Sequence, residues 1–387
     1  MATLDYIVLI AYFLVMAVIG IICMFKIKAS EDFFMGGRSF GKVLQTFAAF
    51  GAGTGSNDPV NVGRTTWTSG LAGIWSVLLW LFVTPFYWIF GVWYRRMRHI
   101  TIGDWYVERY QSKTLGAAYA VFGIYFYMYY LSSMFTAVVK VSIPLIGPET
   151  LVALGLDDPE QLKYWFIPAM SLLIVVYGIL GGLKAAYWTD LIQGVGIIVL
   201  SIILIPTGLQ ALIEAFPESG QSEGLYRGFE IMHERTPAEY FQIFGGPRST
   251  EFPPHYIVSL TLLALVGIVV QPHFISTGGG SAKNENSARI GLVTGNFLKR
   301  FCTIGWALTG LILLTLMASN VEVAADPDQV WGVASREILS KLNLGLVGLM
   351  LACLLGAMMS SADTYMIMTA GLVTRNFSVP FRPNATD

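Results

Sequence analysis

The sequence is poor in charge, cysteine and histidine. Asp, Glu, Lys and Arg make up 13% of its 387 residues, about half the share that is usual for a soluble domain. The net charge of −1 gives nucleic acid no electrostatic reason to bind. The three cysteines (Cys23, Cys302 and Cys353) all lie in apolar segments, and the four histidines are dispersed. We therefore expect neither a disulfide framework nor a transition-metal site.

Catalytic motifs are also missing from the sequence. It offers no nucleophile beside a base, no metal cluster and no phosphate-binding loop at usable spacing. We therefore predict that the protein is not an enzyme, and composition gives no sign of an obligate protein partner.

Hydrophobic residues dominate what is present, at 55% of the chain. Crossing the apolar core of a bilayer takes roughly 20 helical residues, and apolar stretches of about that length recur along the sequence. They lie at about 6–25, 43–69, 71–94, 115–146, 164–182, 188–213, 255–276, 297–319 and 343–373. The sequence therefore predicts an all-α, polytopic membrane helix bundle that contacts the lipid bilayer.

The flanks of the first apolar stretch predict its orientation. Asp5 precedes it, Lys26 and Lys28 follow it, and it lacks a basic leader and a small-residue cleavage site, so we expect a retained anchor. Alternating the loops from an external N-terminus puts most Lys and Arg on one side, with Lys299 and Arg300 counted in a loop there. The positive-inside rule makes that side cytoplasmic in a cell-membrane protein. One long external segment is expected at about 214–254.

The second apolar stretch is predicted to be broken. "AAFGAGTGSNDPVNVGRTTWTSG" (48–70) places Gly51, Gly53, Gly55 and Pro59 where a membrane helix favours leucine. Glycine costs about 1 kcal/mol and proline about 3 kcal/mol inside a helix. Unwound backbone is tolerated at membrane depth only where protein or a watery cavity satisfies its carbonyls. Such carbonyls are available to a cation.

A second interruption is expected in "VVQPHFISTGGGSAKNENSAR" (269–289), which contains Pro272 and three successive glycines. Interrupted segments at comparable positions in two halves indicate a transporter site near the bilayer midplane. The alternative is an ordinary proline kink followed by a loop, since prolines are frequent in membrane helices.

Oxygen-bearing side chains stand in the middle of the last apolar stretch. Ala357, Ser360, Ser361 and Thr364 share one helix face, and Asp363 lies beside it. Close packing of two helices would explain the small and hydroxyl residues. A buried carboxylate, however, costs about 2.5 to 3.5 kcal/mol and normally has a partner. A hard cation held by hydroxyl and carbonyl oxygens is such a partner.

A second acid, Asp190, lies in "GGLKAAYWTDLIQG" (181–194), about one turn into another apolar helix. A carboxylate at a helix N-terminus is stabilised by the helix dipole, which is the structural explanation. A place on an ion pathway explains the same position.

Four stretches carry a resemblance to a known family: "EDFFMGGRSFG" (31–41), "GGLKAAYWTDLIQ" (181–193), "QPHF" (271–274) and "GAMMSSADTY" (356–365). In this order and spacing they resemble the sodium:solute symporter family. The resemblance implies the leucine-transporter-type fold, with two inverted five-helix repeats and broken helices.

The resemblance implies a sodium ion held between the broken helix and the last apolar helix. Its ligands would be the carbonyls of Gly51, Thr54 and Ala357 and the hydroxyls of Ser360 and Ser361.

The resemblance also implies a second cation site in some members. The matching residues are Ser360, Asp190, Asp363 and Thr364. Two carboxylates in one site would alternatively share a proton, so this group is a cation site or a proton site.

The solute is implied to lie beside the first ion. Its contacts would be Ser56, Asn57 and Asp58, just after the break, with Gln271 opposite. Asp58 would equally pair with Arg64 or with a substrate ammonium. Sugar carriers of the family present acids and amides from the next helix, where this sequence has Val77, Trp80 and other apolar groups, so a sugar is not favoured.

The same resemblance divides the chain. We expect an N-terminal extra helix (1–30), a first repeat (40–213), the external loop (214–254), a partial second repeat of three helices (255–373) and a cytoplasmic tail (374–387). The last two helices of the family fold are missing, so a fragment or truncated product is expected.

These observations favour sodium-coupled uptake of a small organic solute by alternating access. A proton-coupled carrier and a non-transporting solute sensor or channel on the same fold are the alternatives.

Overall fold

The computed structural model describes residues 3–146, 151–152, 155–156, 158–247, 251–340 and 344–378. Within these residues every regular element is a helix, apart from one isolated bridge between Phe40 and Ala282. Six helical stretches of the described chain are long and apolar enough to cross a bilayer. The predictions of an all-α fold and of a multi-pass membrane protein are confirmed.

The long helices are joined by short helical turns. The longer elements are α1 (Thr3–Met24), α3 (Lys42–Gly53), α4 (Asn57–Ser69), α6 (Tyr87–Met97), α7 (Ile102–Tyr110), α8 (Lys113–Ile146), α10 (Leu162–Ala215), α11 (Tyr226–Arg235), α12 (Pro254–Val270), α13 (Glu285–Met317) and α17 (Leu346–Val373). The shorter ones include α2 (Ser30–Met35), α5 (Trp75–Leu78), α14 (Val321–Ala325), α15 (Val330–Ala334) and the π-helical turns η7 (Ser276–Gly280), η9 (Ser335–Leu339) and η10 (Thr374–Ser378).

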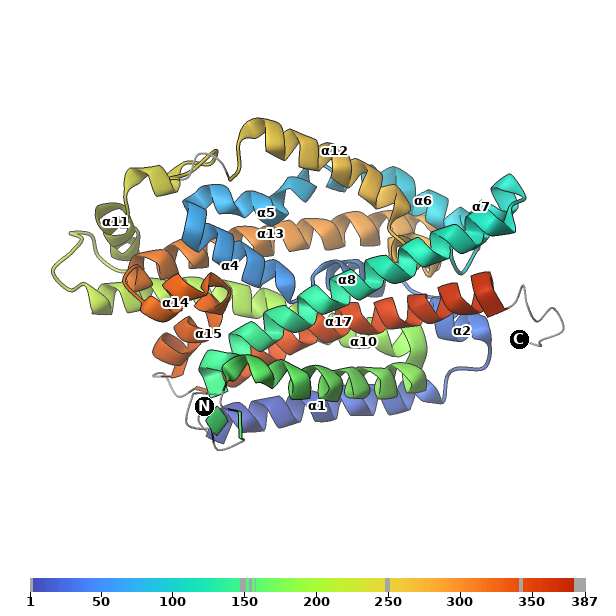
Figure 1. Ribbon diagram of the computed structural model, residues 1–387, viewed down its shortest axis with the longest axis horizontal. Helices are drawn as coiled ribbons and strands as arrows, with labels where there is room; N and C mark the ends of the chain where they lie inside the picture. The colour runs from blue at the N-terminus through green and yellow to red at the C-terminus, as the bar shows by residue number, and fades with distance from the viewer. Residues whose placement is uncertain are drawn as a thin grey trace.

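Most long helices run along the longest axis of the molecule, and α8 crosses them at an angle (Figure 1). Helix α17 packs between α8 and α10, and α13 packs against α3, α4, α6 and α10. The short helices α11, α14 and α15 gather at one end of the bundle, whereas α2 and α7 lie at the other. Helices α3, α13 and α17 therefore form the interior, and α1 covers one outer edge.

The predicted interruptions are present. Helix α3 ends at Gly53 and α4 begins at Asn57. Helix α12 ends at Val270, and Gln271 adopts extended backbone (φ −66°, ψ 128°), so this segment is a true break and not a kink within one helix. A third break falls between the two stretches predicted at 164–182 and 188–213, where Gly182 has a φ of 51°, a conformation that glycine adopts at no steric cost.

One predicted helix begins earlier than expected. Helix α13 starts at Glu285 and not at 297, because the side chain of Asn284 accepts a hydrogen bond from the backbone N–H of Ser287 and caps its first turn. Lys299 and Arg300 are therefore buried inside a membrane-spanning helix. Their assignment to a cytoplasmic loop was wrong.

Two predicted connecting segments are partly described. The segment at 214–254 contains the amphipathic helix α11. The predicted tail begins as η10, and its residues from 379 onward lie outside the described part of the chain.

Candidate functional site

The break between α3 and α4 is held by its own side chains and backbone. The N–H of Thr54 donates to the carbonyl of Gly51 at 2.9 Å. The carboxylate of Asp58 accepts from the N–H of Gly55 at 3.1 Å, which satisfies one donor that the interruption leaves without a helical partner. The glycine-rich sequence thus forms a defined turn at membrane depth.

Helix α17 contacts this break through two hydroxyls. The Ser361 hydroxyl donates to the Gly51 carbonyl at 3.2 Å, and the Tyr365 hydroxyl donates to the Ala52 carbonyl at 3.3 Å. Both hydroxyl-bearing residues are buried. The predicted meeting of the unwound stretch with the hydroxyl-bearing helix is thus present in the structure.

Two further residues of the predicted sodium set, Thr54 and Ala357, border a small cavity of about 40 Å³. A cavity needs roughly 10 to 15 Å³ to hold one water molecule. The Thr54 hydroxyl is buried there without a hydrogen-bond partner. Most of the cavity lining is apolar, and Gly51, Ser360 and Ser361 do not border it.

Ser360 takes part in a different contact. Its hydroxyl donates to the Asp190 carboxylate of α10 at 2.5 Å. Asp190 lies well inside the helical segment that follows Gly182, so a helix-terminal dipole, which acts within the first turn, does not explain it. The two predicted cation sites are adjacent, because a Cβ atom at Gly51 would lie 2.4 Å from the Ser360 hydroxyl oxygen and 3.0 Å from the Asp190 carboxyl carbon.

Some oxygen atoms of the second predicted cation or proton site lack hydrogen-bond partners. One carboxylate oxygen of Asp190 and the hydroxyl of Thr364 are buried without a partner. The Asp363 carboxylate, 1% exposed, accepts from the N–H of Thr364 at 2.6 Å. Buried oxygens that lack donors are where a cation, a proton or an ordered water is expected.

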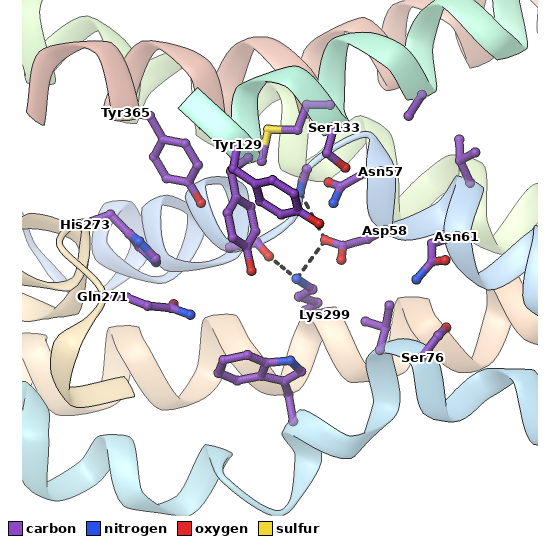
Figure 2. Close-up of a pocket in the computed structure, with 18 of the residues that line it drawn as sticks. Asn57, Asp58, Asn61, Ser76, Tyr129, Ser133, Gln271, His273, Lys299 and Tyr365 are labelled. Carbon is purple, nitrogen blue, oxygen red and sulfur yellow. Dashed lines mark hydrogen bonds and ion pairs between the residues drawn. The ribbon is translucent and has the colours of Figure 1, made fainter. Parts of the chain in front are cut away.

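A cavity of about 530 Å³ opens beside the break. Figure 2 shows side chains from several helices facing it, with Gln271, His273 and Tyr365 on one side and Asn57 and Asp58 on the other. The predicted solute contacts Asn57, Asp58 and Gln271 line this cavity. The fourth, Ser56, donates instead to the backbone carbonyl of Met134 in α8 at 2.8 Å.

Asp58 does not pair with Arg64, one of the two partners considered from the sequence. It forms an ion pair with Lys299 of α13 at 2.7 Å (Figure 2). Lys299 also donates to the Gly53 carbonyl at the end of α3. Arg64 pairs with Asp328 at 3.4 Å. Because Arg64 pairs with a residue of the short helical turn η8 (Pro327–Gln329), the interpretation of Arg64 as the partner of Asp58 was wrong.

Sequence reasoning missed the contribution of α13 to the cavity. Asn296, Lys299 and Arg300 all line it. The available signal was a polar stripe at helical spacing, which Thr303 continues, inside an otherwise apolar run. Reading the polar residues before 297 as a loop hid this stripe.

Aromatic residues form the wall next to the break. Tyr365 packs against Tyr127 and His273, with ring centroids 4.9 and 5.3 Å apart. Tyr130 from the aromatic run 125–135 also lines the cavity. Aromatic residues of this run therefore both line the cavity and pack against another helix.

Comparisons with known proteins agree with this geometry. The chain is 25% identical to sodium/glucose cotransporter 4 of Danio rerio, over 99% of this chain and 59% of that protein. It is 20% identical to the sodium/sialic acid symporter NanT of Aliivibrio fischeri, over 99% of this chain and 72% of that protein. The chain thus spans about three fifths of the length of the first of these relatives.

The fold has a close structural counterpart. A solved structure of a Na+-coupled sialic acid symporter in a substrate-bound outward-open state superposes with a TM-score of 0.78 at 16% identity, covering 100% of this chain and 76% of that one. This likeness confirms the leucine-transporter-type fold. Residues 33–387 match the sequence pattern of the sodium:solute symporter family, and the chain therefore belongs to the sodium:solute symporter family.

Proposed function

We propose that the chain forms the ion- and solute-binding part of a sodium-coupled symporter that takes up a small organic solute. The observation that carries this proposal is the 3.2 Å contact between the Ser361 hydroxyl and the Gly51 carbonyl, at a helix break beside a cavity. Unwound carbonyls and helix hydroxyls are the donors that coordinate Na+ in transporters with broken helices.

The first sodium site would use the carbonyls of Gly51, Thr54 and Ala357 and the hydroxyls of Ser360 and Ser361. All five residues are buried. The atoms proposed to coordinate the ion are hard oxygens, which suit an alkali cation better than they suit a soft metal. Binding would require the Ser360 hydroxyl to turn from Asp190, or to bridge Asp190 and the ion.

The second group, Asp190, Asp363 and Thr364, would hold another cation or a proton. The partnerless carboxylate oxygen of Asp190 favours an additional positive charge there. A proton-coupled carrier is thus the second candidate function, and Asp190→Asn separates the two. If Asp190→Asn makes uptake depend less steeply on sodium concentration, a second sodium ion is supported. If only the pH dependence of uptake is lost, a proton is supported.

The solute would occupy the 530 Å³ cavity, contacted by Asn57, Asp58 and Gln271. Val77 and Trp80 also line this cavity. The helices that carry the contacts come from both interrupted segments, so the solute would lie between the proposed repeats 40–213 and 255–373.

Transport would proceed by alternating access, in which one helix bundle rocks against the other around the site. A tenfold sodium gradient supplies about 1.4 kcal/mol, and a membrane potential of 100 mV supplies about 2.3 kcal/mol for each charge. We place the protein in the cell membrane with its N-terminus outside. A solute sensor on the same fold would bind solute without accumulating it.

The test is sodium-dependent stabilisation and uptake by the protein in proteoliposomes. Ser361→Ala removes one proposed ligand and should lower the apparent sodium affinity about tenfold, as a loss of about 1.4 kcal/mol does. The matched control is Thr369→Ala on the same helix, because the Thr369 hydroxyl donates to the Tyr365 carbonyl of its own helix. Equal sodium affinity in both variants, or uptake that persists without sodium, would contradict the proposal.

A further inference from the structure

The charged residues that line the large cavity are unevenly paired. The cavity wall contains four cations and two acids, namely Arg64, Lys140, Lys299, Arg300, Asp58 and Asp328. Lys299 pairs with Asp58 at 2.7 Å and Arg64 with Asp328 at 3.4 Å. Lys140 pairs with Glu160 at 2.5 Å and with Asp326 at 2.7 Å. Every lining cation except Arg300 therefore has a carboxylate partner among the described residues.

Arg300 is held at the wall by a single neutral acceptor. Its Nη1 group donates to the carbonyl of Val77 at 2.7 Å. Its Nε–H is buried without an acceptor, and the residue is 4% exposed. Among the described residues no carboxylate lies within ion-pair distance of it. A buried charge without a counter-charge costs stability, so such groups normally have a partner.

We propose that Arg300 is a specificity-determining residue that binds a carboxylate group of the solute. This inference rests on the proposed function, because it assigns a solute class to the same cavity. A guanidinium group binds a carboxylate through two parallel N–H···O bonds, and Arg300 has terminal N–H donors besides the one that reaches the carbonyl of Val77. The solute then supplies the carboxylate partner that Arg300 lacks among the described residues.

The surroundings of Arg300 fit an organic carboxylate. Val77, Trp80 and Tyr87 line the cavity with it and supply apolar contacts for the body of a solute. The neighbouring pair of Asp58 and Lys299 is already neutral, so it offers polar contacts without asking for a second charge. A neutral sugar or a lone ammonium group would leave the charge of Arg300 uncompensated.

The experiment compares carboxylates with their neutral amides on the purified chain in detergent. The probes are acetate and nicotinate, with acetamide and nicotinamide as matched neutral partners, and methanesulfonate, phosphate, proline and glucose as other classes. Binding is measured as the concentration-dependent rise of the thermal unfolding temperature, followed by tryptophan fluorescence, in sodium and in potassium. The variants are Arg300→Gln and Arg300→Lys, and the control is Arg289→Gln. Arg289 lies on the same helix with a buried Nε–H that also lacks an acceptor, but it does not line the cavity.

The carboxylates should bind at least tenfold more tightly than their amides. Arg300→Gln should abolish that preference, Arg300→Lys should keep part of it, and Arg289→Gln should behave as the unmodified protein does. Without a probe, Arg300→Gln should unfold no earlier than the unmodified protein, whereas a purely structural arginine predicts a lower unfolding temperature. If Arg300→Gln does not fold, the carboxylate and amide comparison on the unmodified protein and on Arg300→Lys decides.

The inference is overturned by equal binding of amides and carboxylates, by an undiminished preference in Arg300→Gln, or by binding of no carboxylate to the folded protein. Preferential binding of phosphate or methanesulfonate also overturns it. Sodium-dependent binding of glucose or nicotinamide would remove the carboxylate inference and leave symport intact. Carboxylate binding that is the same in sodium and potassium would support Arg300 and contradict sodium coupling.

Discussion

Gly51 should be the most sensitive small residue of the proposed ion site. An added Cβ atom would lie 2.4 Å from the Ser360 hydroxyl oxygen, closer than real Cβ contacts, and 3.0 Å from the Asp190 carboxyl carbon, which is a tight contact. In Gly51→Ala the serine must move, and its hydrogen bond to Asp190 is lost.

The magnitude of the Gly51→Ala effect combines three terms. Overpacking of a buried site costs about 1 to 3 kcal/mol, and losing a hydrogen bond to a charged group costs about 1.5 to 3 kcal/mol. Replacing glycine inside a helix returns about 1 kcal/mol. We expect a net loss of about 2 kcal/mol or more in the free energy of unfolding, and a fall in sodium affinity of more than tenfold.

Gly53→Ala is the matched control, because no atom lies within 4 Å of a Cβ atom at Gly53, which also ends α3. The assay is the rise of unfolding temperature on replacing potassium with sodium, measured for both variants. Gly53→Ala should keep the full sodium-dependent rise, and Gly51→Ala should lose it. A sodium-dependent rise of equal size in the two variants would refute the reasoning that places the ion against Gly51.

Three further predictions concern neighbouring contacts. Asp58→Asn and Lys299→Gln should each lower the free energy of unfolding by roughly 3 kcal/mol, because each leaves a buried charge unpaired, and thermal unfolding of the double variant should show a loss well below the sum of the two. Ser360→Ala removes the hydrogen bond to Asp190 and should lower the free energy of unfolding by about 1 to 3 kcal/mol, because it leaves another buried carboxylate oxygen without a donor; an unchanged unfolding temperature would count against this contact. Trp331→Phe removes a 2.8 Å hydrogen bond to a carbonyl of α4 and should cost about 1 kcal/mol, measured as a lower unfolding temperature with unchanged sodium affinity.

The sequence was most informative where residues that are unfavourable in a bilayer interrupt an apolar stretch. Glycine and proline in a spanning stretch predicted a break there, and the resemblance to the symporter family placed the helix of Ser361 against that break. Such residues are costly in a bilayer unless the fold uses them, so their positions are strong signals. Hydropathy alone also located most spanning helices.

The sequence was uninformative where polar residues continue a helix. Lys299 and Arg300 resemble the basic residues that flank a membrane span, so the start of α13 was misplaced. Which acid pairs with Lys299 depends on how α4 and α13 pack, and no local pattern encodes that contact. The local signal for the true start of α13 is Asn284, a residue type that favours the N-cap position of a helix.

Tyr365 follows Ser361 by roughly one helical turn, and its ring forms part of the cavity wall while its hydroxyl reaches Ala52 in the break. One short segment of α17 therefore borders both the large cavity and the proposed sodium site. A solute that displaced that ring would therefore also be expected to disturb the proposed ion ligands on the same helix. Thermodynamic reciprocity then requires that the solute tighten sodium by the same factor by which sodium tightens the solute, and titrating either one at fixed levels of the other measures that single factor.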